Sequence, residues 1–181
     1  MKETITKEIE LPKEVTVNVD GSVLKVNGGK GEVTRDFRHP RVQISMSEGK
    51  VVVEAKNGTK REKKMIGSFV SHIKNMIAGV QEPHKYVLKI CSGHFPMNVT
   101  VSGEEVVVKN FLGEAVPRRI TVLTGADVKV NGDEVVVSSS DKEVAGQMAA
   151  RIENLCRITN KDRRIFQDGI YMTHKAGKDI V

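Results

Sequence analysis

The sequence contains 181 residues, of which 39% are hydrophobic and 4% aromatic, and it carries a formal net charge of +6. This length predicts one or two ordinary domains, and no run approaches the roughly 18 apolar residues that a membrane-spanning helix requires. The charged, alternating start is unlike a signal peptide and two cysteines are too few for a disulfide framework, so we expect a protein of the reducing cytoplasm with no membrane partner.

The first half of the chain is predicted to form a β-rich module that ends in a helix. Alternation of apolar and polar residues predicts strands at 15–19 and 42–47, each followed across a turn by a further strand. Further along, Thr59 and Glu62 have the spacing of a helix capping box. Seven apolar residues between 65 and 77 then recur on one helical face.

The same pattern returns in the second half of the chain, which indicates a tandem duplication. Residues 99–103 match residues 17–21 at an offset of 82, and the valines at 135–137 match an earlier run at an offset of 84. The seven apolar helix positions reappear at an offset of 79. We therefore predict an α+β protein of two duplicated domains, residues 1–82 and 83–181, in each of which a small antiparallel sheet packs against one helix.

The difference between these offsets indicates an insertion before the first helix. The helix match places Ser138 and Asp141 at the capping positions, and it gives the first copy five additional residues between Lys56 and Lys64. This segment contains the basic residues Lys60, Arg61, Lys63 and Lys64. It is interpreted either as a loop that contacts RNA, in addition to the tail described below, or as a solvated first turn of the helix.

No group of catalytic or metal-binding residues stands out. Cys91 and His94 have the spacing of a ligand pair, but a zinc site needs three or four protein ligands and no second pair accompanies them. No nucleophile stands beside a base, and adjacent carboxylates fall at predicted hairpin turns. We therefore expect no enzymatic activity, cofactor, metal or small-molecule substrate.

Two short motifs in the second half are ambiguous. His94-Phe95-Pro96 precedes a predicted strand, and its simpler interpretation is a tight turn with Phe95 buried. Arg118 and Arg119 lie on a predicted strand, where they either reach RNA or face solvent.

The segment 160–175 near the end of the chain shows neither helical nor strand periodicity. It places five basic side chains beside Phe166 and Tyr171, namely Lys161, Arg163, Arg164, His174 and Lys175. Guanidinium groups and aromatic rings in an irregular segment favour contact with phosphates and stacking on bases. The alternative is a solvated basic tail whose two rings pack in the core. Because the first module ends at its helix, we expect the second to be largely complete near Asn160.

The sequence resembles the ribosomal protein L6 family over nearly its whole length, and the archaeal and eukaryotic branch of that family in particular. The resemblance rests on the duplicated module and on three motifs, residues 75–80, 94–99 and 162–171, of which the last is the most specific. The short acidic start, without a long basic extension, resembles archaeal members.

The resemblance implies two tandem α+β domains without enzymatic activity, assembled into the large ribosomal subunit in the cytoplasm together with other large-subunit proteins. In the family, the second domain and its tail contact 23S rRNA near the sarcin–ricin loop, close to where translational GTPases bind. The primary RNA contacts implied for this chain are Lys161, Arg163, Arg164, Gln167, Tyr171, His174 and Lys175, and the secondary contacts are His94, Arg118 and Arg119. The alternatives are a free regulatory protein that binds single-stranded RNA through the same irregular basic tail, and an enzyme whose site is not recognised.

Overall fold

The computed structural model describes residues 3–12, 14–47 and 49–180, and the chain divides into two units, Met1–Pro83 and His84–Val181. Each unit has its own hydrophobic core, and within the described residues each contains one α-helix and antiparallel sheets. The predicted α+β class and the duplication are confirmed. Each unit contains two sheets, however, rather than the single sheet that the sequence suggested.

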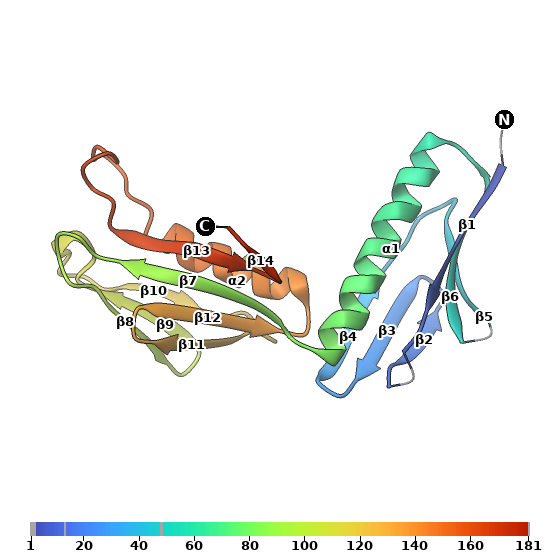
Figure 1. The fold of residues 1–181 in the computed structure, drawn as a ribbon, viewed down its shortest axis with the longest axis horizontal. Coiled ribbons are helices and arrows are strands. Elements are labelled where there is room, and N and C mark those ends of the chain that lie inside the picture. The colour runs from blue at the N-terminus through green and yellow to red at the C-terminus, as the bar shows by residue number, and fades with distance from the viewer. Residues whose placement is uncertain (1–2, 13, 48, 181) are drawn as a thin grey trace. The chain divides into compact units, whose positions relative to one another are not determined.

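Unit 1 (Met1–Pro83) places one long helix over two small sheets. In chain order, its described elements are β1 (Glu3–Glu10), β2 (Thr16–Asp20), β3 (Val23–Gly28), β4 (Gly31–Asp36), β5 (Gln43–Ser47), β6 (Lys50–Gly58) and α1 (Lys60–Gln81). The strand orders are β1-β6-β5 and β2-β3-β4, and α1 contacts strands of both sheets (Figure 1). Because alternate side chains of a strand point to opposite faces, Leu24, Val26, Val51 and Val53 all enter the core shared with α1.

The predicted capping box starts α1. The Thr59 side chain accepts a hydrogen bond from the backbone N–H of Arg61, and the Glu62 carboxylate accepts from both the hydroxyl and the backbone N–H of Thr59. The hydroxyl bond, the backbone bond and smaller contributions hold the pKa of Glu62 at about 2 instead of 4.5. Glu62 therefore remains ionised at neutral pH although it is only 5% exposed.

The glycine-rich segment 27–31 packs against the other end of α1. The backbone N–H of Lys30 donates to the carbonyl of Val80 at 3.0 Å. A Cβ on Gly28 would lie 2.8 Å from the Val80 side chain, so any larger residue would displace the helix or the strand. Gly28 therefore allows this turn to pack closely against the end of α1.

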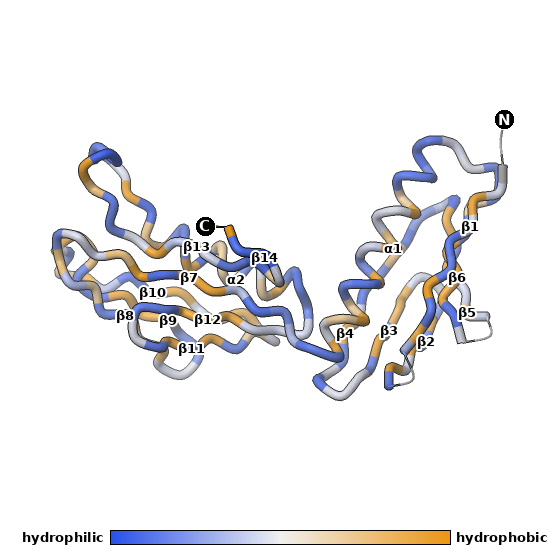
Figure 2. The backbone as a smooth tube through the Cα atoms, in the orientation of Figure 1, coloured by the Kyte–Doolittle hydropathy of each residue, from blue (hydrophilic) through white to orange (hydrophobic). Residues whose placement is uncertain are grey.

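Unit 2 (His84–Val181) repeats this architecture and adds to it. Its described elements are β7 (His84–Cys91), β8 (Asn98–Ser102), β9 (Glu105–Lys109), a short 3-10 helix (Phe111–Gly113), β10 (Arg118–Thr121), β11 (Asp127–Asn131), β12 (Glu134–Ser139), α2 (Lys142–Leu155), β13 (Gly169–Lys175) and β14 (Lys178–Asp179). The strand orders are β10-β9-β8 and β11-β12-β7-β13-β14. Hydrophobic and hydrophilic residues alternate along the strands of both units (Figure 2).

The strands β13 and β14 have no counterpart in unit 1. By strand order, β8, β9 and β10 correspond to β2, β3 and β4, while β7, β12 and β11 correspond to β1, β6 and β5. In unit 2 the outer edge of β7 pairs with β13, and Ile170 of β13 is 1% exposed in the core. The expectation that unit 2 is largely complete near Asn160 is therefore wrong, because the last part of the chain supplies a strand of its sheet.

The segment expected to be irregular consequently divides in two. Residues 160–168 have no regular structure, as expected, but Gly169–Lys175 pairs with β7 as an antiparallel strand. A bulge between Met172 and His174 shifts the strand register, which breaks the period of two that would have marked the strand in the sequence. Tyr171 is 39% exposed, so its ring is not packed in the core.

The helix α2 starts at a different residue from the one predicted. Asp141 is the N-cap and accepts a hydrogen bond from a backbone N–H of the first turn at 2.8 Å, whereas Ser138 lies in β12. Thr59 and Asp141 are 82 residues apart, but the buried faces still match at an offset of 79, as Ile73 and Ile152 do. Relative to its buried face, α1 therefore begins about one turn earlier than α2.

Candidate nucleic-acid interface

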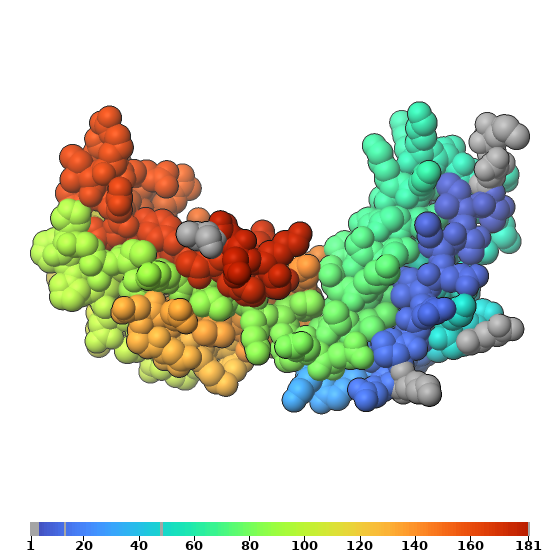
Figure 3. All heavy atoms as spheres, viewed as in Figure 1, coloured from blue at the N-terminus to red at the C-terminus, as the bar shows by residue number. Residues whose placement is uncertain are grey.

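The irregular part of the tail forms a loop that connects α2 to β13 and projects from unit 2 (Figure 1; Figure 3). We refer to residues 157–168 as the tail loop. It contains four of the predicted contacts, all exposed: Lys161, Arg163, Arg164 and Gln167. The helix α2 and the strand β13 fix the two ends of the loop, so it starts and finishes on unit 2.

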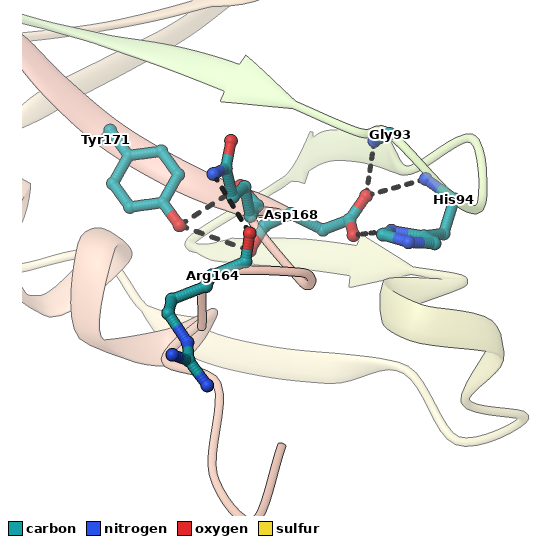
Figure 4. A network of polar contacts seen from close by, with 6 residues as sticks. Gly93, His94, Arg164, Asp168 and Tyr171 are labelled. Carbon is teal, nitrogen blue, oxygen red and sulfur yellow. Dashed lines mark hydrogen bonds and ion pairs between the residues drawn. The ribbon is translucent and has the colours of Figure 1, made fainter. Parts of the chain in front are cut away.

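Asp168 anchors the tail loop. Its carboxylate, 1% exposed, accepts hydrogen bonds from the backbone N–H of Gly93 and from the backbone N–H of His94 at 2.9 Å (Figure 4). The ring Nδ1 of His94 lies 2.5 Å from the second carboxylate oxygen. Asp168 thus joins the tail loop to the turn after β7, although His94 is 74 residues away in the sequence.

The hydrogen bonds to Asp168 determine its charge. Burial alone would raise the pKa of this carboxyl group, but the hydrogen bonds from the backbone and ring of His94 and from Gly93 outweigh burial and hold the pKa below its ordinary value of 3.8. Asp168 is therefore ionised at neutral pH. The hydrogen bonds that its carboxylate accepts come from the turn after β7 and not from the exposed cations of the tail loop.

Phe166 stacks on the turn after β7. Its ring centroid lies 4.7 Å from that of His94 at an interplanar angle of 28°, and the Lys161 Nζ lies 4.9 Å from the Phe166 centroid. The three side chains form a stack of a cation and two rings, held at its base by Asp168. The structure thus brings two predicted contacts, Lys161 and His94, to one place.

Arg163 and Arg164 are both exposed, and Arg163 also lines an opening beside the end of α2 together with Tyr171. The Arg164 side chain is 90% exposed and pairs with the Asp162 carboxylate at 2.7 Å, which lowers the pKa of Asp162. An exposed ion pair of this kind contributes little stability and is readily exchanged for another anion. Figure 4 shows the Arg164 guanidinium directed away from Asp168, towards solvent.

Gln167 and Tyr171 line an open pocket at the base of the tail loop. The Tyr171 hydroxyl donates to the Gln167 carbonyl at 3.2 Å (Figure 4). The pocket has a volume of about 610 Å³ and is also lined by Ile165, Asp168 and residues 91–94. Burial raises the pKa of Tyr171, so its hydroxyl is protonated at neutral pH. The pocket therefore offers a ring face and hydrogen-bonding groups, which an unstacked nucleobase requires.

His174 and Lys175 lie at the other end of β13, apart from the tail loop. The His174 Nδ1 is 2.6 Å from the Asp179 carboxylate, and the second ring nitrogen accepts a hydrogen bond from the backbone N–H of Gly177. These bonds hold together the hairpin of β13 and β14. The structure does not group these two predicted contacts with the other tail residues.

Arg118 and Arg119 have different environments because neighbouring residues of a strand point to opposite faces. Arg118 donates to the carbonyl of Leu155 at 2.6 Å and forms a two-pronged pair with Glu114 at 2.6 and 2.8 Å. Its guanidinium is thus occupied in fastening β10 to the end of α2. Arg119 is 64% exposed, and its guanidinium lies 3.9 Å from the Glu105 carboxylate.

Phe95 was expected to be buried in a tight turn, but it is 46% exposed. Asp168 draws the backbone of the turn at residues 93 and 94 towards the tail loop. The Phe95 ring lies instead beside Gly113, where a Cβ would be 3.5 Å from the ring. Aromatic surface at this end of unit 2 is therefore accessible from solvent.

Sequence reasoning did not identify Asp168 and Gly93 as residues that join the tail loop to the turn after β7. An acidic residue within a basic tail gives no local indication of a partner in another turn. Within residues 3–12, 14–47 and 49–180, no group of three or more His, Cys, Asp or Glu side chains is placed to hold a metal ion, and no helix has the length and apolarity needed to span a membrane. The chemistry that the tail loop offers is positive charge, aromatic surface and hydrogen-bond donors.

Comparison with known proteins gives consistent matches along both units. A family model described as Ribosomal protein L6 matches residues 11–83 and 95–169. The large ribosomal subunit protein uL6 of Methanococcus vannielii is 48% identical over 174 residues, which cover 96% of each chain. The protein of the same name from Methanocella arvoryzae is 46% identical over 94% of this chain and 97% of the relative, and that from Nanoarchaeum equitans is 45% identical over 98% and 96%.

Proposed function

The chain belongs to the ribosomal protein L6 family, and we propose that it binds 23S rRNA near the sarcin–ricin loop through the tail loop of unit 2. As a member of this family it is a structural component of the large ribosomal subunit in the cytoplasm, and not an enzyme. In that position, unit 2 lies close to the site where translational GTPases bind.

The proposal rests on the exposed positive charge of the tail loop. Lys161, Arg163 and Arg164 are exposed, while donors within the unit satisfy the buried Asp168. Each cation that meets a phosphate releases condensed counterions, which favours binding. Because Asp168 holds the loop before RNA arrives, less conformational freedom is lost on association.

The aromatic groups suit irregular RNA better than a duplex. The stack of His94 on Phe166 and the ring of Tyr171 at the pocket offer surfaces for bases that are not paired. Loops and bulges of rRNA present such bases, whereas the deep major groove of an RNA duplex hides them. The tail loop is therefore suited to a folded RNA loop.

Equilibrium binding of the full chain to archaeal 23S rRNA at several salt concentrations tests the proposal. The double substitution Arg163→Ala/Arg164→Ala should weaken binding by about eightfold at 0.1 M salt for each phosphate contact that is lost. The slope of log affinity against log salt concentration should become shallower by about 0.9 for each such contact. The matched control Lys85→Ala/Lys129→Ala removes the same charge from exposed positions on the five-stranded sheet. Equal binding by both double variants would place the RNA-binding surface elsewhere.

Co-sedimentation with large ribosomal subunits tests the assembly part of the proposal. A structural component bound through many phosphate contacts should remain with the subunits after a high-salt wash, and the Arg163→Ala/Arg164→Ala variant should be released at lower salt than the control variant. Complete release of the unchanged protein as a free molecule would favour a regulatory RNA-binding protein instead.

A further inference from the structure

The basic start of α1 in unit 1 has no role in the function proposed for the tail loop. Five exposed cations gather there, Lys56 at the end of β6 and Lys60, Arg61, Lys63 and Lys64 in the first turns of α1. Among the residues that the structure describes, none of the five has an acidic partner within 4.0 Å. We refer to these five residues as the α1 basic patch.

The patch faces outward from unit 1. At 3.6 residues per turn, residues 60, 61, 63 and 64 fall within an arc of about 160° on the face opposite the buried Ile66 and Ile73. The acid of the same turn, Glu62, is directed inward, where Thr59 donates to it and Arg41 lies at 3.5 Å. The outward face of the helix start is therefore positive only, and its side chains project from the surface of unit 1 (Figure 3).

This charge opposes the electrostatics of the helix. The start of an α-helix carries partial positive charge and is stabilised by acidic residues. The duplicated helix α2 follows that rule, with Asp141 as its N-cap and Glu143 in its first turn. The first turn of α1 also contains an acid, the buried Glu62, but its first five residues carry four exposed cations, whereas those of α2 carry only Lys142. The comparison of the two units indicates that folding of the helix does not require this positive charge.

The patch also coincides with the residues by which unit 1 exceeds unit 2. The valine runs of β6 and β12 match at an offset of 84, the N-caps at 82 and the buried helix faces at 79. Two of the five additional residues therefore lengthen the connection into α1, and three add a first turn. Lys56 lies in the lengthened connection, and the other four cations of the patch lie in the first turns of α1.

We propose that the α1 basic patch is a second RNA-binding surface, which contacts the phosphate backbone of a ribosomal RNA duplex. This inference rests on the function proposed above, because rRNA is the polyanion that a component of the large subunit meets. Residues 56–64 include no aromatic side chain, so the patch supplies charge without a stacking surface. That chemistry suits phosphates of a duplex rather than unpaired bases, and it lacks the buried apolar or aromatic anchors on which a protein interface relies.

A charge-neutralised full chain tests this surface. The variant changes Lys60, Arg61, Lys63 and Lys64 to Gln, which has a similar helix propensity, and its matched control changes the exposed residues Lys7, Lys25, Lys30 and Lys74 of unit 1 to Gln. Affinity for archaeal 23S rRNA is measured against salt. If two of the four cations contact phosphates, the patch variant should bind about 60-fold more weakly at 0.1 M salt, with a log–log slope reduced by about 2 relative to the control.

The unfolding temperature separates a binding role from a folding role. The patch variant should unfold at the same temperature as the unchanged protein or higher, because cations are unfavourable at a helix start. If the patch variant and its control bind 23S rRNA equally, the proposal is overturned. A third outcome is that the patch variant binds naked 23S rRNA normally but is lost from reconstituted large subunits. That result would assign the patch to a protein partner and would also overturn the proposal. The variant Arg163→Ala/Arg164→Ala, measured in parallel, shows whether the tail-loop proposal stands or fails independently.

Discussion

Replacement of Asp168 by alanine tests whether the tail loop is anchored as described. The substitution removes the acceptor for two backbone N–H groups, those of Gly93 and His94, and for the His94 ring. A hydrogen bond to a charged group contributes about 1.5–3 kcal/mol. Gly93 and His94 are exposed residues and the His94 ring is 37% exposed, so water replaces part of what their donors lose. We expect the free energy of unfolding of unit 2 to fall by about 1–4 kcal/mol in urea.

A second Asp–His pair in the same unit provides the control. Asp179 lies 2.6 Å from the His174 ring, but its side chain is 81% exposed, so Asp179→Ala should change the free energy of unfolding by less than about 1 kcal/mol. Asp168→Asn keeps one acceptor oxygen and should fall between the two alanine variants. RNA affinity should decline with Asp168→Ala as well, because the cations of the tail loop are no longer held in place.

The pH dependence of stability provides an independent check. Folding lowers the pKa of Asp168 below 3.8, so its stabilising effect is fully present above pH 3.8 and is lost as the pH falls through the folded value. The stability difference between the unchanged protein and Asp168→Asn should shrink as the pH falls below 3.8 through the folded pKa of Asp168. A loss under about 0.5 kcal/mol for Asp168→Ala, or a difference that grows below pH 3.8, would refute the anchoring role.

Three further predictions concern the folded units. Ile152 is fully buried, so Ile152→Ala should lower the free energy of unfolding in denaturant melts by about 2–5 kcal/mol, and a similar loss for exposed Gln147→Ala would contradict this packing. Because its bonds to Thr59 hold the pKa of Glu62 at about 2, Glu62→Gln should destabilise the protein at neutral pH, and the difference should disappear in acid-unfolding curves between pH 4.5 and 2; a constant difference would argue against the capping box. A chain that ends after Thr159 lacks β13, so calorimetry should show the transition of unit 1 without that of unit 2, and two unchanged transitions would contradict the role of β13.

The duplication was predictable because both copies show the same local alternation of apolar and polar residues in the sequence. Alternation over five or six residues identified the strands, and the apolar face of each helix fixed a register that the buried Ile73 and Ile152 share. The start of α2 could not be predicted equally well, since Ser138 and Asp141 are both common capping residues. Only the hydrogen bond accepted by Asp141 decides between them.

The strand β13 and the anchoring of the tail loop depend on contacts that no local pattern expresses. The bulge after Met172 removes the alternation of β13, and Asp168 meets His94 only because β13 pairs with β7. Arg118 and Arg119 look equivalent in the sequence, yet strand geometry commits one to the carbonyl of Leu155 and leaves the other exposed. Composition could indicate a basic tail, whereas the three-dimensional pairing of strands decides which of its cations gather at one site.

Hydroxyl-radical footprinting of 23S rRNA in reconstituted archaeal large subunits tests the central proposal most directly. Subunits that contain the unchanged protein should show protected nucleotides in or beside the sarcin–ricin loop. With Arg163→Ala/Arg164→Ala these nucleotides should become reactive, while Lys85→Ala/Lys129→Ala should leave them protected. Protection confined to other parts of the rRNA, or protection of the sarcin–ricin region that persists in the arginine variant, would contradict the assignment of the tail loop as its binding surface.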